Sequence, residues 1–239
     1  MKKFAVFDID GTLIRWQLYH AIADSMVKLG FVKPEAYDSV KLARMDWKRR
    51  SPGASFRTYE LELIKVYDRV LAGLTTDQFE AAAQVVFDEY KDQVYTYTRE
   101  LIKDLKSRDY LLFAISGSQI EIVELIARYY EFDDFAGSIY ERAGQKFTGH
   151  LTIGAHNKDQ TLKLMVEKHD AGFAGSIAVG DSLSDAVMLE MVEQPIAFNP
   201  DKDLFERAKK QGWKVVLERK NMIYELEGKD GKYQLAKTS

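Results

Sequence analysis

The fold is decided by the stretch Phe4-Ala5-Val6-Phe7-Asp8-Ile9-Asp10-Gly11-Thr12, in which a short apolar run leads into two aspartates. Four consecutive apolar residues are typical of a strand buried on both faces of a parallel sheet. Asp8 and Asp10 follow that strand and, being two residues apart on an extended chain, should face the same way. Ligands bind at the carboxyl ends of such strands. The stretch therefore predicts a fold class and the position of a site.

Short apolar runs of the same kind recur along the chain and alternate with segments of helical periodicity. This alternation predicts an α/β fold with a doubly wound, Rossmann-like parallel sheet. The predicted strands are 4–7, 111–115, 177–179, 195–198 and 215–217. The predicted helices are 97–107, 119–130, 159–169, 184–192 and 202–210.

Residues 16–94 break the alternation, because they contain no pattern of a buried strand. A connection of this length is far outside the usual range for loops in such folds, which indicates an inserted all-helical subdomain. We therefore expect an α/β core of residues 1–15 and 95–239 and a helical cap of residues 16–94. The predicted cap helices lie near 17–29, 36–48, 56–72 and 77–93, the last opening with a capping box at Thr75–Gln78.

Two β-hairpins are also predicted, each from two extended segments that flank a turn. The first joins 138–141 to 146–149. The second joins 222–226 to 232–235 across Gly228-Lys229-Asp230-Gly231.

The composition narrows the functional classes. The 239 residues include no cysteine, which excludes disulfides, thiolate metal sites and cysteine nucleophiles. A net charge of −3 gives no general attraction to nucleic acid. No apolar run reaches 18 residues, and the apolar start of the chain is too short for a signal peptide. We therefore expect a cytoplasmic protein without a nucleic-acid or membrane partner.

Asp8 and Asp10 suit phosphoryl chemistry if their carboxylates converge. One carboxylate can attack a phosphorus atom. The other can protonate the departing oxygen and then activate water for the second step. Gly11 permits the sharp chain reversal that follows. Taken alone, the stretch also fits a surface Asp-Gly turn that carries ordinary acids.

Ser116-Gly117-Ser118 follows the predicted strand 111–115 and is expected to open the next helix. Free N–H groups and the helix dipole at such a position favour an anionic oxygen. The Ser116 hydroxyl would add a donor, and Gly117 would let the backbone approach closely. The alternative is an ordinary strand-to-helix turn with a serine cap.

Lys158 stands at the predicted start of a helix, where the dipole favours acids rather than bases. A phosphate bound nearby would explain this lysine. The alternative is a solvated lysine, one of the 34 lysines and arginines of the chain.

Gly180-Asp181-Ser182-Leu183-Ser184-Asp185 follows the predicted strand 177–179 and leads into a helix. Carboxylate oxygens are ligands that Mg²⁺ prefers, and it usually takes one or two of them together with substrate phosphate and water. The alternative is a helix N-cap with acids in the first turn, which explains Asp185 better than Asp181.

The four motifs fall at strand or helix ends that such a sheet delivers to one rim. Two acids, an anion-binding turn, a lysine and a metal-binding acid are what phosphoryl transfer needs, because that reaction depends on positioning and charge neutralisation. In this set the chain resembles the haloacid dehalogenase (HAD) superfamily of phosphatases. Within it, the chain resembles the phosphoserine phosphatase branch, subfamily IB, which has a helical cap after the first motif. The resemblance covers essentially the whole chain.

The resemblance implies a Mg²⁺-dependent hydrolase of a small phosphorylated metabolite that acts through an aspartyl-phosphate. Asp8 would be the nucleophile and a metal ligand. Asp10 would be the general acid/base, with its backbone carbonyl on the metal. The other implied roles are phosphate binding by Thr12, Ser116 and Gly117, charge neutralisation by Lys158, Mg²⁺ ligation by Asp181 and support of the site by Asp185.

Two other functions stay open at this point: a phosphotransferase of the same fold, and a non-catalytic module that binds a phosphate ligand. Ser118 and Ser182 stand where phosphoserine phosphatase typically has glycine, so the resemblance does not assign phosphoserine as the substrate. Arg44, Arg49 or Arg57 of the cap could grip an acidic substrate. The alternative for each arginine is a solvated helix face.

Overall fold

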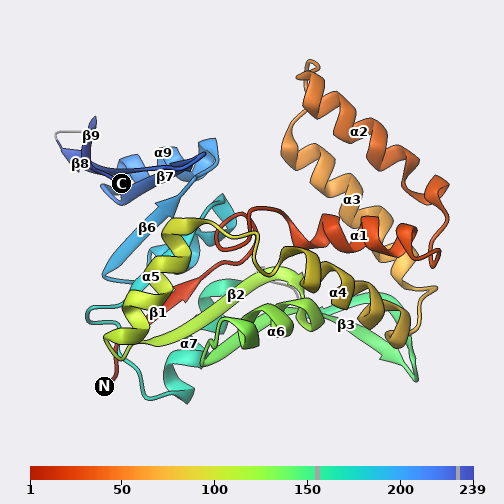
Figure 1. The fold of residues 1–239 in the computed structure, drawn as a ribbon, viewed down its shortest axis with the longest axis horizontal. Coiled ribbons are helices and arrows are strands. Elements are labelled where there is room, and N and C mark those ends of the chain that lie inside the picture. Colours follow the sequence, from red (N-terminus) through yellow and green to blue (C-terminus); the bar gives the residue numbers. More distant parts are fainter. Residues whose placement is uncertain (154–156, 230–231) are drawn as a thin grey trace.

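The computed structural model describes residues 1–153, 157–229 and 232–239. Within them, nine strands form one sheet in the order β4-β3-β2-β1-β5-β6-β7-β8-β9 (Figure 1). The parallel strands are β1 (Phe4–Phe7), β2 (Leu111–Gln119), β3 (Asp134–Ala143), β5 (Ile177–Gly180), β6 (Gln194–Phe198) and β7 (Lys214–Arg219). The antiparallel strands are β4 (Lys146–Ile153), β8 (Met222–Lys229) and β9 (Lys232–Thr238). The predicted mainly parallel α/β sheet is confirmed.

Both predicted hairpins are present, and both extend the central sheet at its edges. Residues 230 and 231 of the second turn lie outside the described residues. The sequence does not predict the first half of β3, where Asp134 to Ala136 pair in parallel with β2. Its acid, aromatic and small residues do not form an apolar run, because this strand lies near the sheet edge and is only half-buried.

Helices cover both faces of the sheet, as the alternating pattern predicts. On one face lie α5 (Thr96–Ser107) and α6 (Ile120–Tyr129), and on the other α7 (Lys158–Lys168), α8 (Ala186–Leu189) and α9 (Lys202–Gln211). The helix predicted over 184–192 is shorter than expected. It consists of a 3₁₀ turn, η3 (Leu183–Asp185), followed by α8. Because β6 begins at Gln194, the chain must leave the helix early to enter the next strand.

The region between β1 and α5 is helical, as predicted, and resembles a HAD cap. It contains α1 (Leu18–Lys28), η1 (Pro34–Tyr37), α2 (Asp38–Arg49), α3 (Phe56–Leu71) and α4 (Thr76–Tyr90). The predicted capping box is confirmed, because the Thr75 hydroxyl accepts from Gln78 N and the Gln78 side chain accepts from Thr75 N. The α2–α3 pair projects away from the sheet (Figure 1). The domain limits at 16 and 94 stay a prediction.

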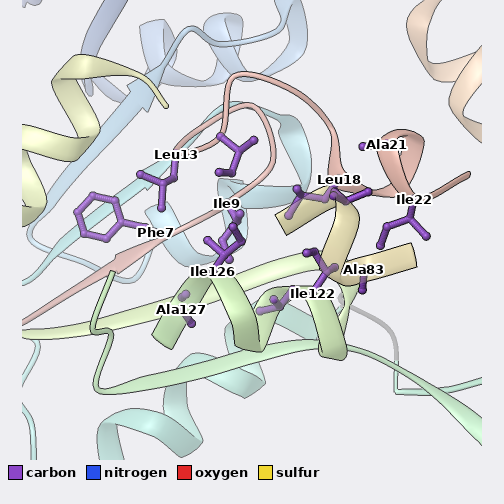
Figure 2. Packing of buried hydrophobic residues seen from close by; sticks show 14 of the residues in the cluster. Phe7, Ile9, Leu13, Leu18, Ala21, Ile22, Ala83, Ile122, Ile126 and Ala127 are labelled. Carbon is purple, nitrogen blue, oxygen red and sulfur yellow. The ribbon is translucent and has the colours of Figure 1, made fainter. Parts of the chain in front are cut away.

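Strand β1 is buried on both faces, which explains why its sequence does not alternate between apolar and polar residues. Phe4 and Val6 belong to the hydrophobic cluster on one face of the sheet, and Ala5 and Phe7 to the cluster on the other. The second cluster continues from the core into the helical region. Figure 2 shows Ile122 of α6 near Ala83 of α4, and Phe7 further along in the same cluster beside Leu13. The core and the helical region therefore share one apolar interior.

The β3–β4 hairpin holds the far end of the helical region. Thr76 N donates to Gln145 O at 2.9 Å, and Phe147 N donates to Leu74 O at 3.2 Å. The Tyr140 hydroxyl donates to Asp68 Oδ1 at 2.8 Å. These bonds fix α3 and α4 where they meet the core and leave the α2–α3 connection projecting.

No helix in the described part of the chain is both long and apolar enough to cross a bilayer.

Candidate active site

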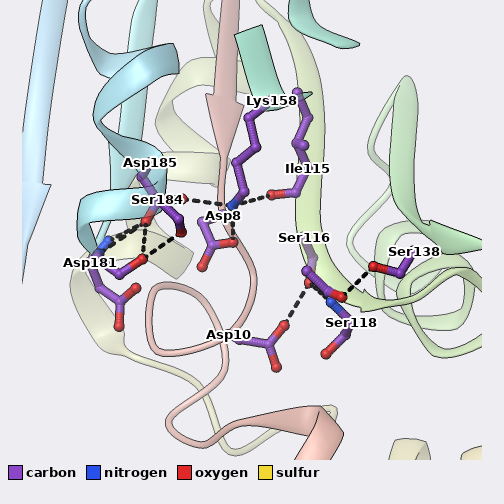
Figure 3. Close-up of polar contacts among 12 residues, drawn as sticks. Asp8, Asp10, Ile115, Ser116, Ser118, Ser138, Lys158, Asp181, Ser184 and Asp185 are labelled. Atoms are coloured by element: carbon purple, nitrogen blue, oxygen red, sulfur yellow. Dashed lines mark hydrogen bonds and ion pairs between the residues drawn. The ribbon is translucent and has the colours of Figure 1, made fainter. Parts of the chain in front are cut away.

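Asp8 lies directly after β1, with its backbone N donating to Val179 O of β5 at 3.0 Å. The residue is only 4% exposed. Oδ1 accepts from Lys158 Nζ at 2.7 Å, while Oδ2 accepts no hydrogen bond from the described chain (Figure 3). Burial raises the pKa of Asp8 to about 8, although Lys158 opposes this rise. One oxygen is thus held in place and the other is left unpaired.

Two donors, neither of which contacts Asp8, orient the Asp10 carboxyl group. Its Oδ1 accepts from the backbone N of Leu18 at 2.5 Å, and its Oδ2 accepts from the Ser116 hydroxyl at 2.6 Å. Burial raises the pKa of Asp10, and the hydrogen bond from Ser116 works against this rise. Because Leu18 opens α1, the first helix after the motif orients the carboxyl. The sequence alone does not predict this contact, because the donor is a backbone N–H group that any residue at this position would supply.

Lys158 is the first residue of α7 and is 3% exposed, which excludes the solvated-lysine alternative. Its Nζ donates to Asp8 Oδ1 at 2.7 Å, to Asp185 Oδ1 at 2.6 Å and to Ile115 O at 3.1 Å. Burial disfavours the charged form, but Asp185 and Asp8 outweigh it and raise the pKa of Lys158. The ammonium is therefore a fixed positive charge between two carboxylates.

Asp185 uses both of its oxygens within the protein. Oδ1 accepts from Lys158, and Oδ2 accepts from the backbone N of Asp181 and of Ser182, each at 3.0 Å. The Asp181 carboxylate accepts no hydrogen bond from the described residues, and burial together with Asp8 raises its pKa well above the usual value. Oxygen atoms of Asp8, Asp181 and Asp185 all lie within 4.8 Å of one another.

Gly11 allows Asp181 to reach this cluster. Its φ of +75° lies in the left-handed region, which glycine adopts without strain. A Cβ atom at this position would lie 2.0 Å from Asp181 Oδ2. The position of Asp181 in the fourth motif therefore requires glycine at position 11 in the first motif.

The second motif differs from its prediction. Ser116 to Ser118 do not open a helix; they continue β2 through a register shift, and α6 begins only at Ile120. The strand continues because Gln119 still pairs with Ser138 of β3. The Ser116 hydroxyl accepts from Ser118 N at 2.9 Å while it donates to Asp10. Gly117 is exposed at the rim of the site, and its carbonyl accepts from the Ser138 hydroxyl at 2.7 Å.

The chemistry of the donor set fits a divalent cation. The Asp181 carboxylate is half-buried, one oxygen of Asp8 is buried, and the described chain pairs neither of them. The raised pKa values of both groups show that negative charge is costly here without a compensating cation. The Thr12 hydroxyl is also fully buried and has no hydrogen-bond partner among the residues that the structure describes. Carboxylate oxygens in this number suit Mg²⁺, which keeps water or phosphate as its other ligands.

Residues 5–190 match the haloacid dehalogenase-like hydrolase family, a match that includes all four motifs. The chain belongs to this family. The resemblance drawn from the motifs is therefore confirmed. The predicted enzyme class, a HAD-type hydrolase, is confirmed at the level of this family.

Curated relatives include hydrolases and phosphatases. A putative hydrolase of Mycobacterium leprae is 24% identical over 61% of this chain, and the chain spans half of that protein's length. A phosphoserine phosphatase of Mycobacterium tuberculosis is 23% identical over 88% of the chain and 69% of its own length. A histidinol-phosphatase of Neisseria meningitidis is 22% identical over 90% of the chain and 99% of its own length.

Solved structures share the fold. A Bordetella pertussis protein of unknown function has a TM-score of 0.71 at 18% identity, covering 90% of this chain and 98% of its own. A phospho-aspartyl intermediate analogue of phosphoserine phosphatase has a TM-score of 0.63 at 22% identity, covering 92% of this chain and 95% of its own. The chain is thus phosphoserine phosphatase-like in fold.

Proposed function

We propose that this protein is a Mg²⁺-dependent phosphomonoester hydrolase that acts through an aspartyl-phosphate on Asp8. The observation that carries the proposal is the state of Asp8. One of its oxygens is fixed by Lys158, the other is unpaired, and the unpaired Asp181 lies beside it. A buried carboxylate of this kind is suited to nucleophilic attack on an electrophile that is held by a cation.

In the first step, an Asp8 oxygen attacks phosphorus, and the bond between phosphorus and the leaving-group oxygen breaks. Asp10 gives its proton to that oxygen. Its raised pKa supports this role, because a buried carboxyl that keeps its proton can act as a general acid. The hydrogen bonds from Ser116 and Leu18 orient it for the transfer.

In the second step, water attacks the phosphorus of the aspartyl-phosphate, and Asp10 takes the proton that the water loses. The bond between phosphorus and the Asp8 oxygen breaks, which restores the Asp8 carboxylate and releases phosphate. Ser116 and Leu18 hold Asp10, and neither of them contacts Asp8. Asp10 can therefore act as the acid in the first step and as the base in the second from the same position.

The remaining site residues position and neutralise charge. Lys158 would balance the phosphoryl charge while it fixes Asp8, and Thr12, Ser116 and Gly117 would bind the phosphoryl oxygens. The side chains of Asp8 and Asp181 and the carbonyl of Asp10 would hold Mg²⁺, with Asp185 as support. The cation, when bound, supplies neutralisation of the charge that develops on the phosphoryl group.

We also propose that residues 16–94 act as a cap over the leaving-group side of the site. α1 supports this proposal, since its first residue holds Asp10. The substrate would be a small phosphorylated metabolite, and the cytoplasmic location stays a prediction.

The test is hydrolysis of p-nitrophenyl phosphate by the purified chain with and without Mg²⁺. Asp8→Asn and a chelator are each expected to abolish phosphate release. Asp88→Asn, which changes an exposed acid of α4, is the control and should keep full activity. Mass spectrometry of acid-quenched protein should find one added phosphoryl group on Asp8. Full activity in Asp8→Asn would contradict the proposal. Transfer of the phosphoryl group to an added alcohol, without release of free phosphate, would instead show a phosphotransferase.

A further inference from the structure

The second motif lies in a bulge of strand β2. Before the bulge, Ile115 pairs with Ala136 of β3, and after it Gln119 pairs with Ser138. Residues 116–118 of β2 therefore oppose a single residue of β3. Bulges are common beside active sites, because they turn side chains and backbone groups away from the regular ladder. The segment that is proposed to bind the phosphoryl group is thus shaped by its contacts with β3.

The single opposing residue is Gly137, and its lack of a side chain lets the bulge lie directly on β3. A Cβ atom at Gly137 would lie 2.8 Å from Ser118 O and 2.9 Å from Ile120 Cα. Both neighbours are backbone atoms, so they cannot turn aside as the end of a flexible side chain can. The bulge and β3 therefore pack backbone to backbone.

The peptide that joins Gly117 to Ser118 is held at both of its polar groups. Its carbonyl accepts from the hydroxyl of Ser138, a buried residue, at 2.7 Å. Its N–H donates to Ser116 Oγ at 2.9 Å. The Ser116 hydroxyl in turn donates to Asp10 Oδ2 at 2.6 Å (Figure 3). A hydrogen-bonded path therefore runs from β3 through one peptide to the proposed general acid.

The two ends of the bulge have other anchors. Ile115 O accepts from Lys158 Nζ at 3.1 Å. At the other end, the Gln119 side chain accepts from the Tyr67 hydroxyl at 2.9 Å. Gly117, in the middle, is exposed at the rim of the site. Loss of the hydroxyl that holds its carbonyl should therefore free the middle of the bulge while both ends stay in place.

We propose that Ser138 is a positioning residue for the phosphoryl-binding bulge. The inference rests on the proposed function, in which Ser116 and Gly117 bind the phosphoryl oxygens. Groups that bind a transferring phosphoryl act best when they are fixed before it arrives, because no free energy is then spent on orienting them. Ser138 supplies this rigidity through its bond to the Gly117 carbonyl and not through contact with the substrate.

Titration calorimetry with inorganic phosphate in the presence of Mg²⁺ tests the proposal without any need for turnover. Ser138→Ala should weaken phosphate binding about fivefold, the effect of losing one neutral hydrogen bond that orders a binding group. Its affinity for Mg²⁺ alone should stay within about twofold, because Ser138 holds the bulge and not the carboxylates that would bind the cation. A general loosening of the site would instead weaken the binding of both ligands.

Ser176→Ala is the matched control. The Ser176 hydroxyl belongs to a fully buried residue and also donates to a backbone carbonyl, Phe173 O, at 2.5 Å. Ser176 directly precedes β5, whose other end leads to Asp181, so its loss should lower stability without changing phosphate affinity. If Ser138→Ala does not fold, Ser138→Cys carries the same test, because a thiol of similar size is only a weak donor.

An unchanged phosphate affinity in Ser138→Ala, or an equal loss in Ser176→Ala, would overturn the assignment of Ser138. An affinity for Mg²⁺ that falls as far as the affinity for phosphate would overturn it as well. Failure of the unsubstituted chain to hydrolyse p-nitrophenyl phosphate would overturn the proposed function instead, and the phosphate affinities would still decide the role of Ser138. An unsubstituted chain that binds no phosphate would overturn both.

Discussion

The Nζ atom of Lys158 lies 2.7 Å from Oδ1 of Asp8, although 150 residues separate them in the sequence. Lys158 also holds Asp185, so one ammonium joins the first strand of the sheet to the turn after β5. The side chains of Asp8, Lys158 and Asp185 are almost fully buried. The site is therefore part of the folded core, and changes in it should affect stability as well as turnover.

Replacing Lys158 by methionine should lower both stability and activity. The change leaves the carboxylates of Asp8 and Asp185 buried without their cation, and breaking a buried pair costs about 3–5 kcal/mol. Loss of a charge that stabilises the transferring group should lower kcat about 100-fold or more. Urea denaturation and phosphate release measure the two effects.

Lys163→Met is the control on the same helix. Lys163 is 63% exposed and lies 3.8 Å from Asp159, so its removal should change the free energy of unfolding by less than about 1 kcal/mol. Equal effects of the two substitutions would show that the buried pair contributes nothing.

Gly11→Ala should disable the site through Asp181. The new Cβ would lie 2.0 Å from Asp181 Oδ2 on a backbone with a positive φ, so the carboxylate has to move. We expect a higher Mg²⁺ concentration for half-maximal activity, or no activity at all. Gly53→Ala controls for backbone strain, because Gly53 has a φ of +77° and no atom within 4 Å of the added Cβ. It should cost about 1 kcal/mol of stability and leave the Mg²⁺ requirement unchanged.

The sequence predicts much of this site because its motifs are contiguous and lie at the ends of buried strands. Phe4 to Phe7 are apolar on both faces, and that pattern is enough to place Asp8 and Asp10 at the edge of a parallel sheet. Lys158 could be assigned only through the family resemblance. Its place at the start of a helix is a weak local signal, and its partners lie far away along the chain.

The sequence does not predict what tertiary pairing imposes. Ser116 to Ser118 have the residues of a helix-opening turn, but pairing of Gln119 with Ser138 keeps them in the strand.

Asp181→Asn should stabilise the metal-free chain. The pKa of Asp181 is raised in the folded state, so above the pKa of an unfolded aspartate its negative charge opposes folding. Removing that charge should raise the free energy of unfolding at pH 7. The unsubstituted chain should gain stability when Mg²⁺ is added, about 2.7 kcal/mol at a hundredfold excess over Kd. Thermal melts with and without a chelator check both changes.

The same variant should lose most of the gain from Mg²⁺, since it lacks a proposed ligand. An Asp181→Asn chain that is less stable than the unsubstituted chain without metal, yet gains as much from Mg²⁺, would exclude Asp181 as a ligand.

His20 should make the fold sensitive to mild acid. Burial, with a contribution from Arg44, lowers its pKa to about 4, against about 6.5 in the unfolded chain. The unfolded state therefore binds a proton first, and stability falls as the pH drops from 6.5 towards 4. Between pH 7 and pH 5 the loss should be about 2 kcal/mol. In His20→Gln the urea midpoint should depend less on pH over this range. His150→Gln, which changes an exposed ring, is the control, and its urea midpoint should vary with pH as that of the unsubstituted chain does.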